Sequence, residues 1–199
     1  MKERKIIFTC SMFFLSVLFI EAGTLIGLVI YYGMPPKQKT LKMDADPVCG
    51  AAHTGRVYNE NFKMAEDGSM EEALIYIKDV SYSGGIPSEP TILDQKGCVY
   101  VPHVFCMIAG QQLLIKNSDA TLHNIHSMPK INKEFNFAMP KVVKEKKSTF
   151  SKSEPNPFYI KCDVHPWMKT WVLVSDHPYF AITDKEGNFS IDGVPSGTY

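Results

Sequence analysis

Four side chains of this sequence could together bind a soft metal ion. Cys162, His165 and Met168 follow the spacing C-x2-H-x2-M. Pro166 does not fit regular strand pairing, so this stretch is expected to form a tight loop. His123, about forty residues upstream, could supply a second imidazole from another strand. Two imidazoles, one thiolate and a weak axial thioether are the ligands of an electron-transfer copper site, so the sequence predicts one mononuclear copper.

Three other interpretations of these residues compete with that site. Zinc rarely binds a thioether, so Met168 argues against a zinc site. A dinuclear copper centre needs two bridging cysteines, and this loop contains only Cys162. Without a metal, Cys162 and Met168 would be buried apolar side chains and the histidines would be hydrogen-bonded surface groups. The complete set of four in this order favours mononuclear copper.

Two short segments carry a resemblance to a known family. H-N-I-H at residues 123–126 and C-D-V-H-P-W-M at residues 162–168 resemble cupredoxins of the plastocyanin and amicyanin kind, which are blue copper proteins. The resemblance covers roughly residues 90–176, and the short loop is most similar to amicyanin. The segments Q-K-G-C-V-Y-V-P-H-V and E-G-N-F-S-I-D-G-V-P-S-G-T-Y are also similar to uncharacterised plastocyanin-like or methylamine-utilisation-like proteins.

The resemblance implies a role for each residue of the site. The metal ligands would be His123, the thiolate of Cys162, the exposed imidazole of His165 and the axial thioether of Met168. Asn124 would help to tie the two ligand loops together. Electrons would pass through His165, with Pro166 and Trp167 shaping an apolar contact patch. Because all four coordination positions are filled, bond-making catalysis is not expected, and the chain is predicted not to be an enzyme.

His126 lies close enough to His123 to be considered as an alternative ligand. Side chains three residues apart on a strand point to opposite faces, so only one of the two should face the metal. The resemblance selects His123. His126 is therefore expected to be a surface histidine or a histidine that supports the ligands.

Short segments rich in β-branched and aromatic residues predict a mainly β chain. Strands are expected at residues 55–62, 73–80, 98–108, 111–117, 123–127, 146–151, 157–162 and 170–175. Many short strands at regular spacing favour an antiparallel sandwich. The resemblance implies a Greek-key cupredoxin β-sandwich, which we place at residues 47–177. The turn residues Asn117 to Asp119 are expected to deliver His123 to one end of it.

The last segment, residues 178–199, contains a hairpin signal. Apolar residues 180–183 and 189–191 flank the turn sequence D-K-E-G-N. The segment resembles the start of a transthyretin-like or carboxypeptidase-regulatory-like β domain. We therefore expect a C-terminal β-hairpin that is either part of a truncated domain or packs on a partner.

The N-terminal residues predict a membrane anchor. Residues 6–32 are overwhelmingly apolar, and as a helix they would exceed the hydrocarbon core of about 30 Å. No clear cleavage site follows, so an uncleaved transmembrane helix at residues 1–33 is expected. The basic residues 2–5 place the N-terminus in the cytoplasm and the copper domain on the periplasmic side. Residues 34–46, with two prolines and several lysines, are expected to be an extended tether.

Three residues of this apolar segment suggest neighbouring helices. Glu21 would be costly in lipid, so it is expected to face protein or water. Gly23 and Gly27 form a G-x-x-x-G spacing that lets another helix approach closely. A helix packed in a multi-subunit membrane complex is therefore expected, although small residues are also common in membrane helices without such a role.

The remaining cysteines are predicted to include a disulfide, because an extracytoplasmic compartment is oxidising. Cys49 and Cys98 each lie at the edge of a turn, and both positions resemble those of the uncharacterised plastocyanin-like proteins. We therefore expect a bond between Cys49 and Cys98, with Cys106 as a buried strand residue. A bond between Cys98 and Cys106 is the alternative.

Composition limits the possible partners. The 21 basic and 21 acidic residues give a formal net charge of zero, and no aromatic and basic motif is present, so nucleic-acid binding is not expected. The function expected is a membrane-anchored type 1 copper electron-transfer protein, a subunit of a redox complex. Its partners would be a cytochrome or another redox subunit, other transmembrane helices and the lipid bilayer. A copper chaperone or sensor and a metal-free structural subunit remain alternatives.

Overall fold

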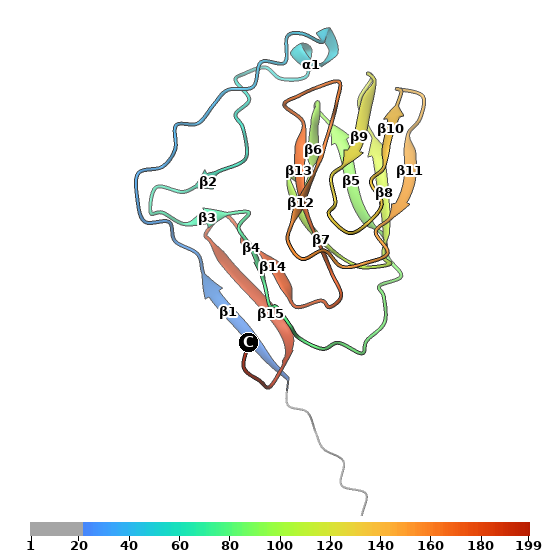
Figure 1. Ribbon diagram of the computed structural model, residues 1–199. Coiled ribbons are helices and arrows are strands. Elements are labelled where there is room, and N and C mark those ends of the chain that lie inside the picture. Colours follow the sequence, from blue (N-terminus) through green and yellow to red (C-terminus); the bar gives the residue numbers. More distant parts are fainter. Residues whose placement is uncertain (1–21) are drawn as a thin grey trace, which may run out of the picture.

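The computed structural model describes residues 22–199, which form strands with one short helix (Figure 1). The mainly β prediction is confirmed for this part of the chain. Most of the strands belong to two packed sheets, and the others lie beside them at the N- and C-terminal ends of the described chain. We call the second group the peripheral strands; it comprises β1 to β4, β14 and β15.

The sandwich contains a five-stranded and a four-stranded sheet. In the five-stranded sheet the order is β10 (Asn136–Met139), β9 (His123–Ser127), β12 (Phe158–Lys161), β13 (Lys169–Ser175) and β7 (Val104–Ile108). In the four-stranded sheet it is β11 (Glu145–Thr149), β8 (Gln112–Asn117), β5 (Thr91–Lys96) and β6 (Val99–Val101). Pairs β13–β7 and β5–β8 are parallel, and the other pairs are antiparallel.

Buried and exposed residues alternate along the strands, and the buried ones form the core between the two sheets. In β8 the buried residues Leu113, Ile115 and Asn117 alternate with more exposed ones. The opposite sheet contributes Ile125 and Ile160, which are both fully buried. Period-two burial of this kind directs one face of each strand to the core, and the hydrophobic effect of this burial is the main stabilising contribution.

The peripheral strands form three two-stranded sheets. The pairs are β1 (Ala22–Leu28) with β15 (Asn188–Pro195), β4 (Leu74–Tyr76) with β14 (Phe180–Ile182), and β2 (Lys63–Met64) with β3 (Met70–Glu71). Their core is small: its buried members are Ile77, Tyr179 and Ile191. Segments from the two ends of the described chain therefore pack together, as Figure 1 shows at the lower left.

The structure corrects the predicted membrane helix over residues 22–33. Residues from 22 onward form the strand β1 and an extended segment, so the helix cannot continue to residue 33. An apolar run alone does not distinguish a helix from a strand, and here glycine and β-branched residues lower the helix propensity. Glu21 and the rest of residues 1–21 lie outside the described residues. Within the described residues, no helix is long and apolar enough to span a membrane.

The predicted helix-packing role of Gly23 and Gly27 is also wrong, because both residues lie on β1. Gly27 instead makes room for a neighbour across the ribbon: a Cβ atom there would lie 2.5 Å from the ring of Phe189. Gly23 has no atom within 4 Å of such a Cβ position. The G-x-x-x-G spacing therefore reflects packing in a β-ribbon at one position only.

Residues 34–46 are not a free tether along their whole length. Thr40 forms a β-bridge with Tyr58, and the Leu41 backbone N–H donates to the Val57 carbonyl at 2.8 Å. Met43 is buried. The second half of this segment is therefore fixed against residues 57–59 and leads into α1 (Pro47–Ala51), which lies at the top of Figure 1.

The C-terminal segment forms two strands, as predicted, but not the expected hairpin. The turn is present, with the Asp184 backbone N–H donating to the Asn188 carbonyl at 3.0 Å. Beyond it, β14 pairs with β4 and β15 pairs with β1, so the two strands have separate partners. These partners belong to the same chain, which answers the question of what the segment packs on.

Several strand boundaries differ from the predictions. The predicted strand at residues 98–108 is divided into β6 and β7 by Pro102, which follows a cis peptide bond. Residues 55–62 form a single bridge at Tyr58 rather than a strand. The strands β5 and β10 lie in segments where none was predicted.

Candidate metal centre

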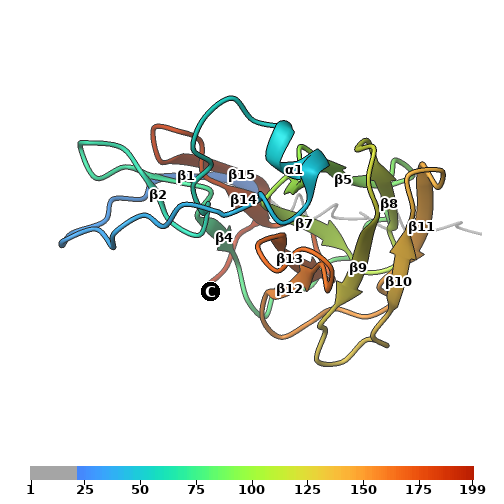
Figure 2. The ribbon, with the colours of Figure 1, turned by 90° about the horizontal axis from the view of Figure 1, so that it is seen from above.

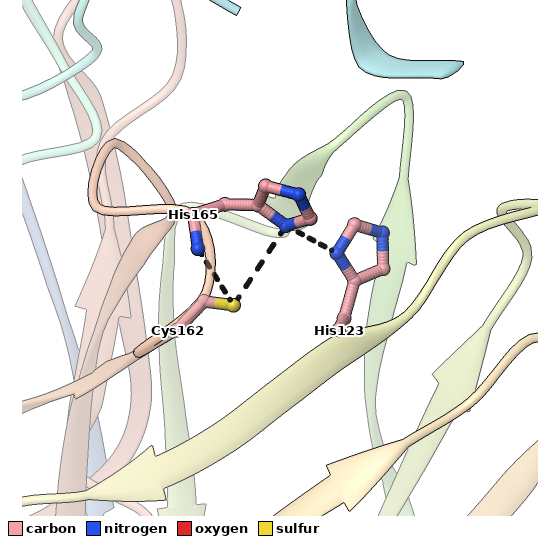
Figure 3. A group of neighbouring side chains, drawn as sticks. All are labelled: His123, Cys162 and His165. Carbon is pink, nitrogen blue, oxygen red and sulfur yellow. Dashed lines mark hydrogen bonds between the residues drawn. The ribbon is translucent and has the colours of Figure 1, made fainter. Parts of the chain in front are cut away.

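Three predicted ligands meet at one end of the sandwich, beneath α1. His123 is the first residue of β9, and Cys162 follows directly after β12. Between β12 and β13 the chain forms a tight turn, in which the Met168 backbone N–H donates to the His165 carbonyl at 2.9 Å. Figure 3 shows His165 in this turn pointing toward His123. The fold therefore brings together residues that are far apart in the sequence.

The facing atoms are the Nδ1 atoms of the two histidines and the sulfur of Cys162 (Figure 3). The two Nδ1 atoms are 3.0 Å apart, and the Cys162 Sγ lies 3.9 Å from Nδ1 of His165. All three ligand atoms lie within 4.8 Å of one another. A single metal ion could be bound by all three, since soft thiolate and imidazole ligands suit copper.

The Cys162 thiol lies in an environment that favours the thiolate. Burial alone would raise its pKa, but hydrogen bonds from His123 and from backbone N–H groups lower the pKa below the ordinary value. The His165 backbone N–H, for example, donates to the sulfur at 3.3 Å. The thiolate is the form that binds metals. The hydrogen bonds from His123 and the backbone therefore favour the form of Cys162 that a metal would bind.

His123 is fully buried and is oriented by Asp119. Its Nε2 lies 2.8 Å from Oδ2 of Asp119, and because a carboxylate only accepts, Nε2 carries the hydrogen. Burial lowers the pKa of His123, but Asp119 and Cys162 outweigh it and raise the pKa to about 9. Asp119 itself accepts from the backbone N–H groups of Gly97 and Cys98. This support fixes the ring with Nδ1 toward Cys162.

His165 is not the exposed imidazole that the resemblance implied. Only 3% of its surface is exposed, because residues 43–52 lie over it. Its Nε2 donates to Oδ2 of Asp46 at 3.1 Å and lies 3.8 Å from Sγ of Cys49. Burial lowers the pKa of this histidine, so the neutral ring presents an unprotonated Nδ1 to the centre. Figure 2 shows α1, within this covering segment, above the strands of the sandwich.

The predicted disulfide is confirmed and holds this covering segment in place. Cys49 and Cys98 are bonded, with Cα atoms 5.4 Å apart and a sequence separation of 49 residues. The alternative bond between Cys98 and Cys106 is therefore wrong. Cys106 is a free, partly buried residue of β7.

The other predicted residues lie close to this centre in different ways. Met168 is buried in the main core, at the end of the same turn as His165. Asn124 accepts from the Asp163 backbone N–H at 3.1 Å, so it joins β9 to the Cys162 loop. Pro166 and Trp167 line a cavity beside the loop.

His126 lies on the other side of β9, as the strand alternation predicted. Its two ring nitrogens contact Oδ2 of Asp163 at 2.7 Å and Oε1 of Glu134 at 2.6 Å. Asp163 is the residue after Cys162, so His126 supports the ligand loop from outside. It does not join the group of ligand atoms around His165.

Comparison with known proteins gives only weak similarity. The chain matches no protein-family model and no curated protein. It is similar in structure to a purple cupredoxin from Nitrosopumilus maritimus, with 21% identity, coverage of 43% of this chain and 99% of the other, and a TM-score of 0.36. An amicyanin variant in the Cu(I) state has 19% identity, coverage of 45% and 86%, and a TM-score of 0.38.

A copper-containing nitrite reductase from Thermus scotoductus is also similar, with 18% identity and a TM-score of 0.38. The match covers 49% of this chain and 25% of the reductase. Identities and TM-scores at this level carry no argument about activity. The function must therefore be argued from the side chains themselves.

Two residues of the centre were missed by reasoning from sequence, namely Asp46 and Asp119. Asp119 lies four residues before His123 in the predicted turn, so its proximity could have been anticipated. Asp46 could not, because it lies 119 positions from its partner His165 in the sequence. Only the disulfide at Cys49 hinted that this segment would be fixed near the ligand loop.

Proposed function

We propose that this chain is a copper electron carrier whose metal would be held by His123, Cys162, His165 and Met168. The observation that carries the proposal is the convergence of two imidazole Nδ1 atoms and one thiolate-favouring cysteine within 4.8 Å. When bound there, copper would supply a one-electron couple between Cu(I) and Cu(II). Hydrogen bonds to Asp119 and Asp46 hold the two imidazoles in place. The change in ligand geometry when the metal gains or loses an electron would therefore be small.

The buried position of the centre supports a carrier rather than an enzyme. Both imidazoles donate a hydrogen bond from Nε2 to a carboxylate, that of Asp119 or Asp46. In addition, α1 and the disulfide cover His165. A substrate would need an open coordination position with an acid or base beside it. The covered ligand leaves no such approach on the His165 side.

The contact with a redox partner is proposed to be the surface formed by α1 and by the segments next to His123 and His165. Apolar side chains beside the centre are exposed there, namely Val48, Leu122 and Val164. Leu122 and Val164 are sequence neighbours of the ligands His123 and His165. Exposed apolar side chains beside the centre suit a brief encounter with a cytochrome or another redox subunit.

Membrane attachment is part of the proposal for residues 1–21. Their apolar sequence after a basic start supports a membrane segment that keeps the copper domain near its partner. The domain would then be on the periplasmic side, where the disulfide between Cys49 and Cys98 is stable.

An absorption spectrum tests the copper proposal. The copper-loaded, oxidised protein is expected to show an intense visible band from the bond between the Cys162 thiolate and copper. A chaperone or sensor would bind Cu(I) without this band, and a metal-free structural subunit would bind no copper. Either result, or zinc in elemental analysis, would contradict the proposal.

A further inference from the structure

A line of apolar side chains is exposed along the first residues that the structure describes. It starts on β1 and continues into the extended segment after it, and its members alternate with other residues. Their exposed fractions are 73% for Ile26, 51% for Leu28, 38% for Ile30 and 88% for Tyr32. Every second side chain of an extended segment points to the same side, so we call these four residues the N-terminal stripe. Exposed apolar surface of this extent normally marks an interaction site.

The apolar surface is confined to β1, because the strand beside it is polar on the same face. Ile26 is paired with Ser190, and Leu28 is paired with Asn188. Residues directly opposite in an antiparallel pair share a face, and both partners are exposed. Among the described residues β1 pairs only with β15, so its other edge is open. A contact with the N-terminal stripe is therefore made along this open edge.

The sequence before β1 indicates what covers the N-terminal stripe. Residues 6–20 are mostly apolar and contain no charged side chain. Glu21 ends this run, and β1 begins at the next residue, Ala22. No spacer separates the two segments. If residues 1–21 attach to a membrane, as proposed above, β1 must therefore begin at the membrane surface.

A second copy of the chain fits the N-terminal stripe less well than lipid does. Pairing of two β1 edges would end with the strand at Leu28, whereas the exposed apolar residues continue to Tyr32 and to Met34, which is 92% exposed. Tyrosine is enriched at the boundary between lipid and water. The hydrated headgroup layer can also satisfy the backbone groups of an open edge, which hydrocarbon cannot.

We propose that the N-terminal stripe rests on a lipid bilayer, with its side chains in the headgroup layer. This inference rests on the proposed membrane attachment of residues 1–21. It also predicts an orientation. Figure 1 shows α1, which covers the candidate metal centre, at the top and β1 at the lower left. Contact along β1 therefore leaves the ligand end of the sandwich away from the bilayer, where a redox partner can reach it.

Methyl signals of the full chain test this contact in phosphatidylcholine nanodiscs that contain a lipid with a nitroxide on its headgroup. The nitroxide broadens the signals of methyl groups close to it. We expect loss of the Ile26 and Ile30 signals. The matched controls are Ile92 on β5 and Val142 in the loop between β10 and β11, which are both exposed. Their signals should remain.

An Ile26 signal as strong as that of Ile92 would overturn the inference, whether residues 6–20 or a second copy covers the stripe instead. Flotation of the full chain with phosphatidylcholine vesicles tests the membrane attachment separately. A chain that floats while Ile26 keeps its signal has the attachment but not this contact. A copper spectrum tests the electron-carrier proposal independently of both.

A double variant locates the contact. Ile26→Ser together with Leu28→Ser removes the apolar side chains from β1, and we expect the Ile30 signal to return in the same nanodiscs. Ile92→Ser is the matched control and should leave the Ile26 and Ile30 signals broadened. Continued loss of the Ile30 signal in the double variant would contradict the inference. If that variant does not fold, the signals of the unmodified chain still decide the question.

Discussion

The sandwich and the peripheral strands both contain many apolar side chains, but the fraction of these side chains that is buried is larger in the sandwich. In the sandwich, two sheets cover each other and enclose a core that includes Ile125 and Ile160. In the peripheral group, β15 buries Ile191 in a small core, but β1 is largely exposed, with 73% of the Ile26 surface accessible. The candidate metal ligands belong to the sandwich, where the two sheets pack on each other.

This difference shows what the candidate metal centre requires. Its ligands come from separate strands and a loop, so they hold their distances only if the strands themselves cannot shift. Dense packing supplies this rigidity, because cores behave like close-packed solids. The peripheral strands make no ligand contact and can therefore tolerate a smaller core.

The largest expected effect is on the centre itself. Cys162→Ser removes the soft sulfur ligand, and we expect complete loss of the visible band in the copper-loaded protein. Circular dichroism should show an unchanged β fold, since serine is similar in size. Cys106→Ser, on β7, is the matched control and should keep the band. A variant at position 162 that retains it would contradict the ligand assignment.

Removal of the disulfide should have the next largest effect. For the double variant Cys49→Ala and Cys98→Ala, chain entropy predicts a loss of about 4 kcal/mol in the free energy of unfolding. Urea unfolding measures this loss. The variant should also increase the solvent accessibility of His165, which hydrogen exchange or chemical modification reports. An unchanged His165 accessibility would mean that α1 stays in place without the bond.

A pair of isoleucine variants measures the difference between the two regions directly. Ile160→Ala in the sandwich should destabilise the protein by about 3 kcal/mol, because it creates a cavity in the core. Ile26→Ala on the exposed ribbon should change the stability by less than about 0.5 kcal/mol. Equal effects in thermal unfolding would show that β1 is buried by a further contact in solution.

The smallest effect concerns a carboxylate that anchors a loop of the sandwich. Glu154 accepts from the backbone N–H groups of Lys130, Ile131 and Asn132. Burial raises the pKa of Glu154, but these hydrogen bonds outweigh it and lower the pKa below 4.5. A lowered pKa stabilises the fold above the unfolded value near 4.5 and loses this contribution as the pH falls through the folded value.

Glu154→Gln should therefore cost roughly 2 kcal/mol at pH 7. The difference from the unmodified chain should shrink below pH 4.5. Thermal unfolding at several pH values measures it. Glu186→Gln, in the exposed turn after β14, is the matched control. A difference that stays constant with pH would show that the neutral side chain, not the charge, holds the loop.

Much of the sandwich could be predicted from the sequence, because local patterns determine it. The boundaries of β9 agree fully with the prediction, and those of β8, β11, β12 and β13 differ by no more than two residues at either end. The three candidate ligands that meet were also predicted, Cys162 and His165 from residue type and spacing, and His123 with the help of the resemblance. Turn residues and alternation are short-range signals, and the strands that obey them are the ones predicted best.

The errors concern contacts between distant segments. The apolar residues 22–28 fit a membrane helix by hydrophobicity alone, and only their pairing with β15 shows a strand. The exposed position of His165 was inferred by resemblance, whereas Asp46 and the disulfide cover it in this chain. Both contacts join segments that are far apart in the sequence, so a local pattern of residues could not predict them.

The carboxylate of Asp46 joins the start of α1 to the candidate ligand His165. It accepts from the Val48 backbone N–H at the start of α1, from the Thr121 hydroxyl and from His165. The disulfide and these hydrogen bonds hold the covering segment over His165, between solvent and the candidate metal centre. We therefore expect stopped-flow copper uptake to be slower for the oxidised apoprotein than for the reduced one.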